Sequence, residues 1–476
     1  MKKSLFLVFI LTIQSVYSQI VSYDNNFAVN GKYAITAGAN ANYLTKILQH
    51  TDESIYFTYA RDNTVLNSPE CVVSKLHPNG TLDSTFGNNG ETVISNYFTA
   101  VDSQLTQQTD GKLLIYGFNT DGSVITRLLP NGQVDTTFGV NGVAKITNVF
   151  TDFNGYGYGL YVQNNKIIIY GLSTDGPSNF YKIIYRLNNN GSIDNTFGNN
   201  GSIKTTGNFV FLDSQSNIIS LISDHSHTNA NTLYPNGGLE KYTSDGQPLT
   251  SFGNNGTLAF NTYPGMVGNA LIDSNNNIIC YNMNNEIFRI SANGAYDTSF
   301  AFDSANAYPF AIISLSSVME KNNSYYIAGQ TGAMGETFFI SELTPSGTVD
   351  PVFNYYSETT PTSEGIGDMI INNNSIIAGR GTHILKFLLS NSTLGTSAKV
   401  TETNLPLFSF ENPVQQNLIY HTKEKVQSIE IYALNGKLIK NIESNNTRIS
   451  EVPKGVYMAK VVFENGKTTT KKLIKN

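Results

Sequence analysis

The segment Asp224–His227 carries two histidines separated by one residue, and it is the nearest approach to a metal-binding pattern in this sequence. On a strand, alternate residues would place both imidazoles on one face, as a zinc site needs. No third ligand can be identified, so we interpret the segment as a solvated loop. Residues Asp273–Asn277 begin like a calcium-binding loop but lack the following Gly and the distant Glu. We interpret them as a hairpin turn.

Two tyrosine-rich segments are candidates for a sugar-binding surface. They are Tyr156, Tyr158 and Tyr161, interleaved with glycines, and the pair Tyr355 and Tyr356. Packing in a β-sheet core explains these tyrosines equally well. The sequence has no phosphate-binding loop, nucleophile elbow, Cys-x-x-Cys pair or His-Glu-x-x-His motif. We therefore predict no catalytic, cofactor-binding or metal-binding residue and no cofactor, and we favour a protein without enzymatic activity.

An aspartate recurs along most of the chain. The repeated aspartates are Asp24, Asp83, Asp135, Asp194, Asp297 and Asp350. The two carboxylates of a glycoside hydrolase lie about 5 to 9.5 Å apart, whereas a residue that occurs once per repeat lies far from its copies. We therefore interpret these aspartates as turn residues that accept hydrogen bonds from backbone N–H groups.

Each aspartate belongs to a longer repeat, whose first full copy is Lys75–Gly90. It consists of a basic residue, an apolar residue, a turn ending in Gly, an apolar residue, Asp, two small polar residues, Phe and, in most copies, Gly-x-x-Gly. In the fourth copy, Lys241–Gly256, Leu249 stands at the position of Asp. The repeated phenylalanines, 48 to 59 residues apart, are Phe27, Phe86, Phe138, Phe197, Phe252, Phe300 and Phe353.

Polar turns and short apolar runs, such as Asp110–Gly117, lie between these copies. Runs of this kind, separated by Asn-Gly, Asp-Gly or Asn-Asn turns, are typical of β-hairpins, and helical periodicity is absent. A unit of about 50 residues with about four strands cannot bury both faces of its own sheet, so neighbouring sheets must stack as blades of a β-propeller. We expect each repeated Phe to fill the gap between two adjacent blades.

The two ends of the repeat region complement each other. Asp24–Gly31 matches the second half of the repeat, and Lys386–Ser392 matches the first half. Seven copies of Phe then predict seven blades, of which the last is built mainly from residues 354–395 and completed by residues 21–31. Such a closure would cover the open edges of the ring.

The stretch Gly80–Gly87 reads Gly-x-Leu-Asp-x-Thr-Phe-Gly. It resembles the delta-60 repeat, a motif of secreted bacterial propeller-like proteins, and the resemblance covers roughly residues 24–395. The resemblance implies a propeller fold and export. It implies no particular activity.

From about Thr401 the repeat stops and a separate module of roughly 75 residues begins. Short strand-like runs alternate with polar turns, which predicts a small Ig-like β-sandwich. The module has 11 Lys and Arg residues against 7 Asp and Glu residues, a net charge of +4. The expected fold class of the whole chain is therefore all-β, a seven-bladed β-propeller followed by this sandwich.

A second resemblance rests on residues spread over the whole module. In chain order they are Phe410, Asn412, Pro413, Leu418, Ile429, Ile431, Tyr432, Gly436, Lys437, Gly455, Val456, Tyr457, Lys471, Lys472, Leu473 and Ile474. They are similar to the type A C-terminal sorting domain of the type IX (Por) secretion system of the Bacteroidetes. This resemblance implies that the type IX machinery is a partner and carries the protein across the outer membrane. The alternative is an Ig-like binding or linker domain without a sorting role.

Lys2 and Lys3 precede an apolar run from Leu5 to Ile13, a pattern that predicts a secretory signal peptide cleaved before Gln19. The run is shorter than the roughly 20 residues that span a bilayer, and no later segment is comparable, so we expect no transmembrane segment. The protein is expected to be secreted or attached to the outer cell surface of a Gram-negative bacterium.

Charged residues make up only 14% of the 476-residue chain, and its net charge is −6. These values exclude a coiled coil, a basic nucleic-acid binder and a strongly charged disordered protein. Cys71 and Cys280 each lie in an apolar run, which favours buried free thiols and leaves a disulfide open.

The predicted domains are a signal peptide at residues 1–18, a propeller at 19–400 and a sorting domain at 401–476. Two functions remain. The first is a secreted or surface-displayed propeller that binds a glycan, a protein or another surface component without turnover. The alternative is a secreted propeller hydrolase or lyase that acts on extracellular polysaccharide or protein, with a site assembled from several blades.

Overall fold

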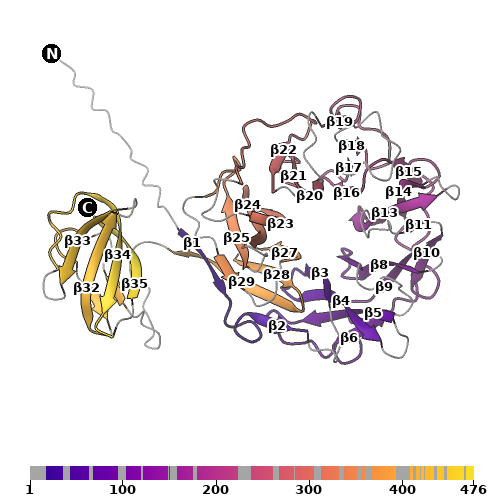
Figure 1. The fold of residues 1–476 in the computed structure, drawn as a ribbon. Coiled ribbons are helices and arrows are strands. Elements are labelled where there is room, and N and C mark those ends of the chain that lie inside the picture. Colours follow the sequence, from indigo (N-terminus) through magenta and orange to yellow (C-terminus); the bar gives the residue numbers. More distant parts are fainter. Residues whose placement is uncertain are drawn as a thin grey trace, which may run out of the picture. The chain divides into compact units, whose positions relative to one another are not determined.

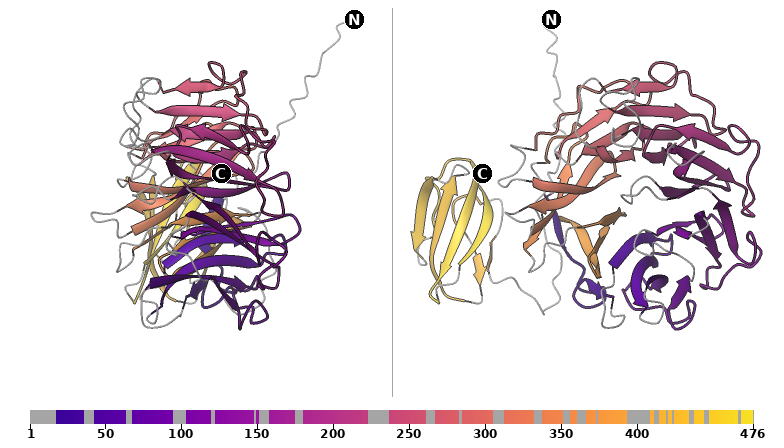
Figure 2. Two further views of the ribbon diagram at one scale, coloured as in Figure 1. Left: turned by 90° about the vertical axis from the view of Figure 1, so that its right-hand side faces the viewer. Right: turned by 45° about the vertical axis from the view of Figure 1, so that its right-hand side comes forward.

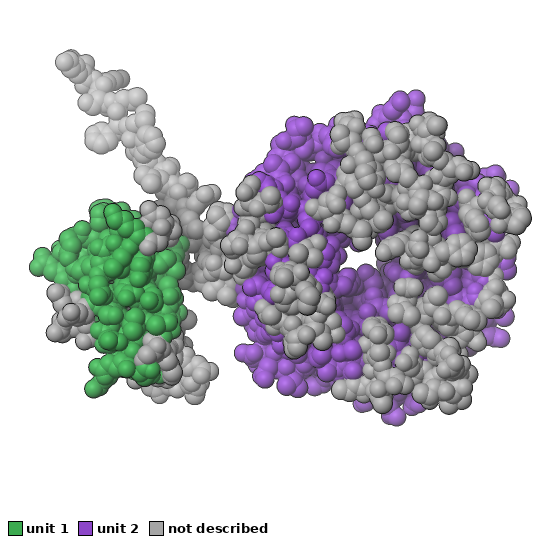
Figure 3. Space-filling model, viewed as in Figure 1, with its two compact units in different colours: residues 1–18, 391–476 green, residues 19–390 purple. Residues whose placement is uncertain are grey.

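The computed structural model describes residues 18–475 with several gaps. The segments outside the description are residues 36–42, 64–67, 95–102, 120–121, 148, 151–157, 175–179, 223–236, 261–266, 283–284, 305–311, 332–336, 351–355, 360–365, 373, 393–407, 411–413, 419, 423, 434–436, 444–446 and 466–467. The predicted signal peptide lies outside the described residues except for Ser18. Two compact units form, one of Gln19–Ser390 and one that contains Asn391–Asn476 (Figure 3).

Seven antiparallel sheets make up the first unit and surround a central opening (Figure 1). Blade 1 consists of β3 (Tyr43–Gln49), β4 (Ile55–Asn63), β5 (Ser68–Leu76) and β6 (Glu91–Ile94). Blade 2 consists of β7 (Gln104–Gln107), β8 (Leu113–Asn119), β9 (Gly122–Leu128) and β10 (Val143–Thr147). Blade 3 consists of β11 (Val149–Phe150), β12 (Gly159–Gln163), β13 (Lys166–Thr174), β14 (Phe180–Leu187) and β15 (Ser202–Thr205).

The next three blades continue the ring (Figure 2). Blade 4 consists of β16 (Phe209–Leu212), β17 (Ile218–Ile222), β18 (Gly238–Tyr242) and β19 (Thr257–Ala259). Blade 5 has three strands in the described residues, β20 (Val267–Ile272), β21 (Ile278–Asn282) and β22 (Ile287–Ile290). Blade 6 consists of β23 (Ile312–Lys321), β24 (Ser324–Thr331), β25 (Thr337–Leu343) and β26 (Tyr356–Thr359).

Blade 7 joins the two ends of the ring. It consists of β27 (Asp368–Ile371), β28 (Ser375–Arg380) and β29 (His383–Ser392), with β1 (Ser18–Tyr23) and β2 (Lys32–Ala34) both paired to β29. The ring of Tyr23 stacks on Phe387 with centroids 4.7 Å apart. The chain therefore forms seven blades. The N-terminal segment closes the ring, as its complementary half-repeat predicted.

The innermost strand of each blade lines the central opening (Figure 1). Contacts run from β3 to β7, β12, β16, β20, β23, β27 and back to β3, so the ring is complete. The strands behind them are buried on both faces because a neighbouring blade packs against each side; residues Leu113–Phe118 of β8 are all buried. Outer strands such as β10 alternate between buried and exposed residues. In the sequence, a continuous apolar run therefore indicates a strand buried on both faces, and an alternating run indicates an outer strand with one exposed face.

The second unit contains two sheets. One pairs β30 (Phe408–Phe410) with β31 (Tyr420–Thr422), and the other has the order β33 (Leu438–Glu443), β32 (Val426–Ala433), β34 (Gly455–Phe463), β35 (Thr468–Lys475). Both sheets contribute to one hydrophobic core, which includes Leu418, Ile429, Val461 and Leu473. The all-β fold, a propeller followed by a β-sheet domain, is confirmed. No helix within the described residues is long and apolar enough to cross a membrane.

Candidate functional site

The repeated phenylalanines lie at the junctions between blades. Six of them are described, and each is at most 8% exposed, whereas Phe353 lies outside the described residues. Phe138, for example, shares a core with Leu114 of blade 2 and Leu187 of blade 3. Each of the six described phenylalanines thus buries its ring against two sheets at once, so the repeat joins neighbouring blades.

The basic residue of the repeat forms an inter-blade cluster with the Phe, the Asp and the turn of the next blade. In blade 2, Arg127 Nε donates to Asp135 Oδ2 at 2.9 Å, and Nη1 donates to the carbonyl of Asn189 in blade 3 at 2.5 Å. The guanidinium lies 4.6 Å from the centroid of the Phe138 ring, within the range of a cation–π interaction. Arg186 and Arg289 make the same three contacts in blades 3 and 5.

A glycine follows four of the repeated phenylalanines and completes this cluster; these glycines are Gly87, Gly139, Gly198 and Gly253. Gly139 N–H donates to the carbonyl of Asn190 in the next blade at 2.8 Å. Gly139 has φ of +53°, and a Cβ there would lie 2.1 Å from the carbonyl oxygen of Val143. At the junction of blades 2 and 3, only glycine therefore fits this close approach.

Three carboxylates of the repeat, those of Asp83, Asp135 and Asp194, have pKa values far below neutral pH. Burial alone would raise the pKa of Asp135, but hydrogen bonds from Thr137 and Lys112 and the charge of Arg127 outweigh burial and lower it to about 2. The pKa values of Asp83 and Asp194 are also about 2, for the same reasons. A carboxyl group that stays charged at neutral pH does not serve as a general acid. The geometry thus agrees with a structural role for the repeated aspartates.

Blade 4 shows how the ring compensates for the missing aspartate. Leu249 occupies the expected backbone position, since its N–H donates to the carbonyl of Lys241 at 2.8 Å, as Asp135 N–H does to Arg127 at 2.9 Å. The ammonium of Lys241 pairs instead with Asp213 at 3.0 Å, and both side chains are at most 4% exposed. Asp213 lies in the turn between β16 and β17. Sequence reasoning missed this residue, although an Asp also opens the corresponding turn of blade 5.

Removing the substitute carboxylate should destabilise the propeller. We expect Asp213→Asn to lower the free energy of unfolding by about 3 kcal/mol, because it leaves the buried Lys241 ammonium without its counter-charge. Adding Leu249→Asp, which restores the repeat, should recover most of the loss. Thermal unfolding of the purified protein measures both changes.

The control for this pair is Asp245→Asn. Asp245 also pairs with an arginine, Arg186 at 3.1 Å, but its side chain is 73% exposed, so we expect an effect below about 1 kcal/mol. Equal effects of the two Asp→Asn changes, or no recovery with Leu249→Asp, would contradict the compensation.

The ring closure repeats the inter-blade cluster with residues from both ends of the chain. Lys386 Nζ lies 3.6 Å from Asp24 Oδ2 and 5.6 Å from the centroid of the Phe27 ring. It also donates to the carbonyl of Pro78 in blade 1 at 3.2 Å. Ala28 N–H donates to Asn79 O at 2.7 Å, in the manner of Gly139. The junction between blades 7 and 1 is therefore held like the others.

The other candidate sites from the sequence have structural roles where the structure describes them. Asp224–His227 lies outside the described residues, and the described residues contain no group of three or more His, Cys, Asp and Glu able to hold a metal. Asp273 Oδ1 accepts hydrogen bonds from the N–H groups of Asn275 and Asn277, and Oδ2 accepts one from Tyr325. These contacts fix the hairpin turn between β20 and β21.

The tyrosines and cysteines are largely core residues. Tyr158 packs against Phe118 with centroids 5.1 Å apart, and Tyr356 packs against Phe387 at 5.1 Å. Tyr156 and Tyr355 lie outside the described residues. Cys71 and Cys280 are buried free thiols, as predicted, and burial raises the pKa of both.

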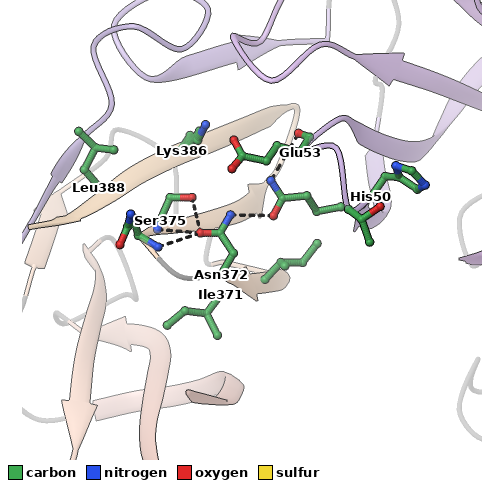
Figure 4. Close-up of a pocket in the computed structure, with 11 residues that line it drawn as sticks. His50, Glu53, Ile371, Asn372, Ser375, Lys386 and Leu388 are labelled. Atoms are coloured by element: carbon green, nitrogen blue, oxygen red, sulfur yellow. Dashed lines mark hydrogen bonds between the residues drawn. The ribbon is translucent and has the colours of Figure 1, made fainter. Parts of the chain in front are cut away.

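A cavity of about 560 Å³ opens beside the closure, between blades 7 and 1 (Figure 4). Its lining residues come from two hairpin turns and from β29; they are Gln49, His50, Thr51, Glu53, Ile370, Ile371, Asn372, Asn374, Ser375, Lys386 and Leu388. The amide of Asn372 bridges the two blades, because it donates to Gln49 Oε1 at 2.9 Å while its oxygen accepts from Ser375 Oγ at 2.9 Å. The Glu53 side chain points from the blade 1 turn toward the strand that carries Lys386 (Figure 4).

The split repeat accounts for this cavity. In blades 1 to 5 the strand that carries the basic residue of the repeat ends one residue after it, and in blade 6 the matching strand, β25, ends one residue after Glu342. Each of these strands leads into a tight turn, such as Leu129–Gln133 in blade 2. In blade 7 the third strand, β29, continues from Phe387 to Ser392. Leu388, which is 37% exposed, lies in this extension and lines the cavity.

Two further grooves have a different origin. One involves Gly87 and Gly132 at the junction of blades 1 and 2, and the other involves Gly253 and Gly294 at the junction of blades 4 and 5. These glycines occupy matching repeat positions, so the grooves are by-products of the repeat. The cavity beside the closure is lined by different positions and is the stronger candidate for a binding site.

The residues that carried the second resemblance divide between the two faces of the C-terminal sheet. Ile429, Ile431, Tyr457 and Leu473 are at most 8% exposed and belong to its core. Lys437, Lys471 and Lys472 are exposed, and Gly455 begins β34. Asn412, Pro413 and Gly436 lie outside the described residues.

Comparison with protein families decides the nature of this module. Residues 410–476 match the family described as a secretion system C-terminal sorting domain. The chain carries a type IX secretion sorting domain. The protein is therefore secreted or attached to the cell surface by that system, and the sorting domain engages its machinery.

The propeller also matches a family. Residues 108–138 and 163–197 match a β-propeller domain of unknown function (DUF5122). These two stretches contain the second and third copies of the Asp and Phe repeat. No curated protein matches the sequence.

Solved structures similar to this chain share little sequence with it. The extracellular domain of a hybrid two-component system from B. thetaiotaomicron is 12% identical with a TM-score of 0.41; the match covers 93% of this chain and 58% of that one. Virginiamycin B lyase from Staphylococcus aureus is 15% identical with a TM-score of 0.42, covering 75% and 99%. The propeller domain of the Trilobed protease from Pyrococcus furiosus is 9% identical with a TM-score of 0.43, covering 75% and 96%. The chain thus spans 58% of the length of the first of these proteins.

Proposed function

We propose that the exported propeller is a binding protein, and that its ligand is an extracellular glycan held in the cavity between blades 7 and 1. The observation that carries the proposal is the lining of this cavity, which lies where the repeat is interrupted. A volume of about 560 Å³ falls within the usual range of ligand sites.

The chemistry of the lining suits a hydroxyl-rich, uncharged molecule. The carboxylate of Glu53 accepts hydrogen bonds, the amide of Asn374 donates and accepts them, and the hydroxyl of Thr51 does both. Leu388 and Ile371 supply apolar surface for the C–H face of a sugar ring. Sugars present this combination of hydroxyl groups and C–H surface.

Binding without turnover is favoured over hydrolysis because the described lining of the cavity contains a single carboxylate, Glu53, whereas a glycoside hydrolase uses a pair. The repeated aspartates do not supply the second one. Asp83, Asp135 and Asp194 are ionised, and each pairs with a basic residue. They serve as parts of the blade junctions, and such a charged group does not protonate a leaving group.

Retention of the secreted, full-length protein on a glycan and glycoprotein panel tests the proposal. We expect Asn374→Ala and Glu53→Gln each to weaken retention about tenfold, the effect of losing one or two hydrogen bonds to a ligand. The matched control is Asn254→Ala, since Asn254 is an exposed asparagine in the repeated groove between blades 4 and 5.

The same panel separates the alternatives. Release of shortened glycans or cleaved polypeptide would establish turnover and overturn the binding-only proposal. Retention that survives removal of the glycans would make the ligand a protein. Equal losses with Asn374→Ala and Asn254→Ala would place the site elsewhere on the propeller.

A further inference from the structure

The outer face of the four-stranded sheet of the sorting domain carries an apolar patch. Three large hydrophobic residues of this face are 36–48% exposed: Leu438, Val456 and Met458. They come from β33 and β34, at the same end of the sheet. Exposed apolar residues that occur singly are ordinary, but a contiguous group marks an interaction surface.

Strand register shows that the patch is contiguous. Leu438 lies opposite Tyr432, Tyr432 lies opposite Met458, and Met458 lies opposite Lys472. Directly opposed residues of antiparallel strands have their side chains on the same face, about 5 Å apart. One row therefore crosses all four strands. In the next row, Val456 lies opposite Ile474.

The residues that carried the second resemblance lie on both faces of the four-stranded sheet. Ile429, Ile431, Tyr457 and Leu473 point into the core, where they hold the domain together. Tyr432, Val456, Lys472 and Ile474 alternate with them along β32, β34 and β35 and lie on the opposite face. The outward-facing residues are not needed to fill the core, so packing inside the domain does not account for the apolar side chains among them.

We propose that this outer-face patch, made of Tyr432, Leu438, Val456, Met458, Lys472 and Ile474, is the surface that the type IX secretion machinery recognises. The partner surface is apolar at its centre and acidic at its rim. The apolar centre follows from the exposed Leu438, Val456 and Met458. The acidic rim follows from the exposed Lys437 and Lys472 beside them and from the net charge of +4 of residues 401–476.

The proposal does not depend on the glycan site, because the patch and the cavity lie in different compact units. It follows instead from the sorting role of residues 410–476. A domain that must be recognised by a transport machinery needs a surface that distinguishes it from other small β-sheet domains. The patch is such a surface.

The test uses the full-length chain with Leu438→Glu and Met458→Glu combined. We expect the amount at the cell surface or in the medium to fall about tenfold or more, as for the loss of central interface residues, with protein accumulating in the periplasm. Leu438→Ile with Met458→Leu keeps the patch apolar and should export normally. Thermal unfolding of the purified variants should match the unmodified protein, since both positions are solvent-facing.

Two controls separate recognition from charge and folding effects. Thr468→Glu adds a carboxylate at an exposed position of β35 away from the patch, and Val134→Glu adds one at a 41% exposed apolar residue of the propeller. Both should leave export unchanged. If the double variant unfolds, Lys472→Glu decides, because reversing this exposed charge should reduce export while the core is untouched.

Normal export of the double variant would overturn the proposal. So would a concentration-dependent dimer of the purified protein that disappears in the double variant, because the patch would then belong to a second copy of this chain.

Discussion

Deletion of residues 401–476 is expected to reduce the amount of protein at the cell surface and in the medium to background, while folded propeller accumulates in the periplasm. The reason is that the sorting domain is what the type IX machinery engages, whereas the propeller does not depend on it for folding. The core of the sorting domain contains residues between Val414 and Leu473 alone. The seven other cores are built from residues 21–389.

Cell fractionation and immunodetection measure this result, and protease resistance of the periplasmic material shows that the propeller is folded. Fusion of residues 391–476 to an unrelated periplasmic protein is the reciprocal experiment and should bring that protein to the surface. A truncated chain that reached the surface in normal amount would show that the propeller, rather than the C-terminal module, carries the export signal.

Much of this fold could be predicted because a repeat imposes the same local requirement in every blade. The turn before Asp83 needs a glycine, the junction needs a buried Phe, and the strands between need apolar residues on both faces. These requirements are met by residues close in sequence, so they leave a visible pattern. Even the closure of the ring could be predicted from the sequence, since the half-repeats around Phe27 and Lys386 complement each other.

Features that depend on distant, unrepeated residues left no such pattern. The carboxylate that pairs with Lys241 comes from Asp213 in a turn, and only the folded blade brings the two together at 3.0 Å. The cavity depends on a hydrogen bond between Asn372 and Gln49, which are 323 residues apart. Neither pair has a spacing that the repeat would reveal.

The sorting domain shows a similar division. Its family pattern was visible in the sequence as an ordered set of residue types, and its strand-like runs predicted a small β-sandwich. The exposed patch could not be read from the sequence, because a bulge in β33 shifts the pairing so that Leu438, rather than Ile439, lies opposite Tyr432. A shift of one residue changes which side chains share a row.

Removal of residues 20–31 is expected to open the ring. The deletion takes away β1 from Ile20 onward and also Phe27, which is fully buried between blades 7 and 1. Burying an aromatic ring of this kind is worth about 3 to 5 kcal/mol. The same deletion leaves Lys386, whose side chain is 10% exposed, without the carboxylate of Asp24. Loss of a buried counter-charge costs a further 3 kcal/mol or so.

The expected result is a thermal midpoint lower by about 10 °C or more, because several kcal/mol are lost and each shifts the midpoint by roughly 2 °C in a domain of this size. The free edge of β29 should also admit protease, with early cleavage between residues 375 and 395. Scanning calorimetry and limited proteolysis with mass spectrometry measure the two effects.

Point variants distinguish the loss of ring closure from a general effect of deleting twelve residues. Val29→Ser changes a residue of the same segment that is 75% exposed and should leave the midpoint unchanged. Phe27→Ala should destabilise the propeller as much as Phe86→Ala does, because each ring fills one blade junction. This should hold even though Phe27 lies near the N-terminus and the rest of blade 7 lies near the end of the propeller sequence. A deletion with an unchanged midpoint, or a Phe27→Ala variant as stable as Val29→Ser, would mean that blade 7 holds without the N-terminal segment. The N-terminal strand would then be an addition to a ring already closed by packing between β27 and β3 alone.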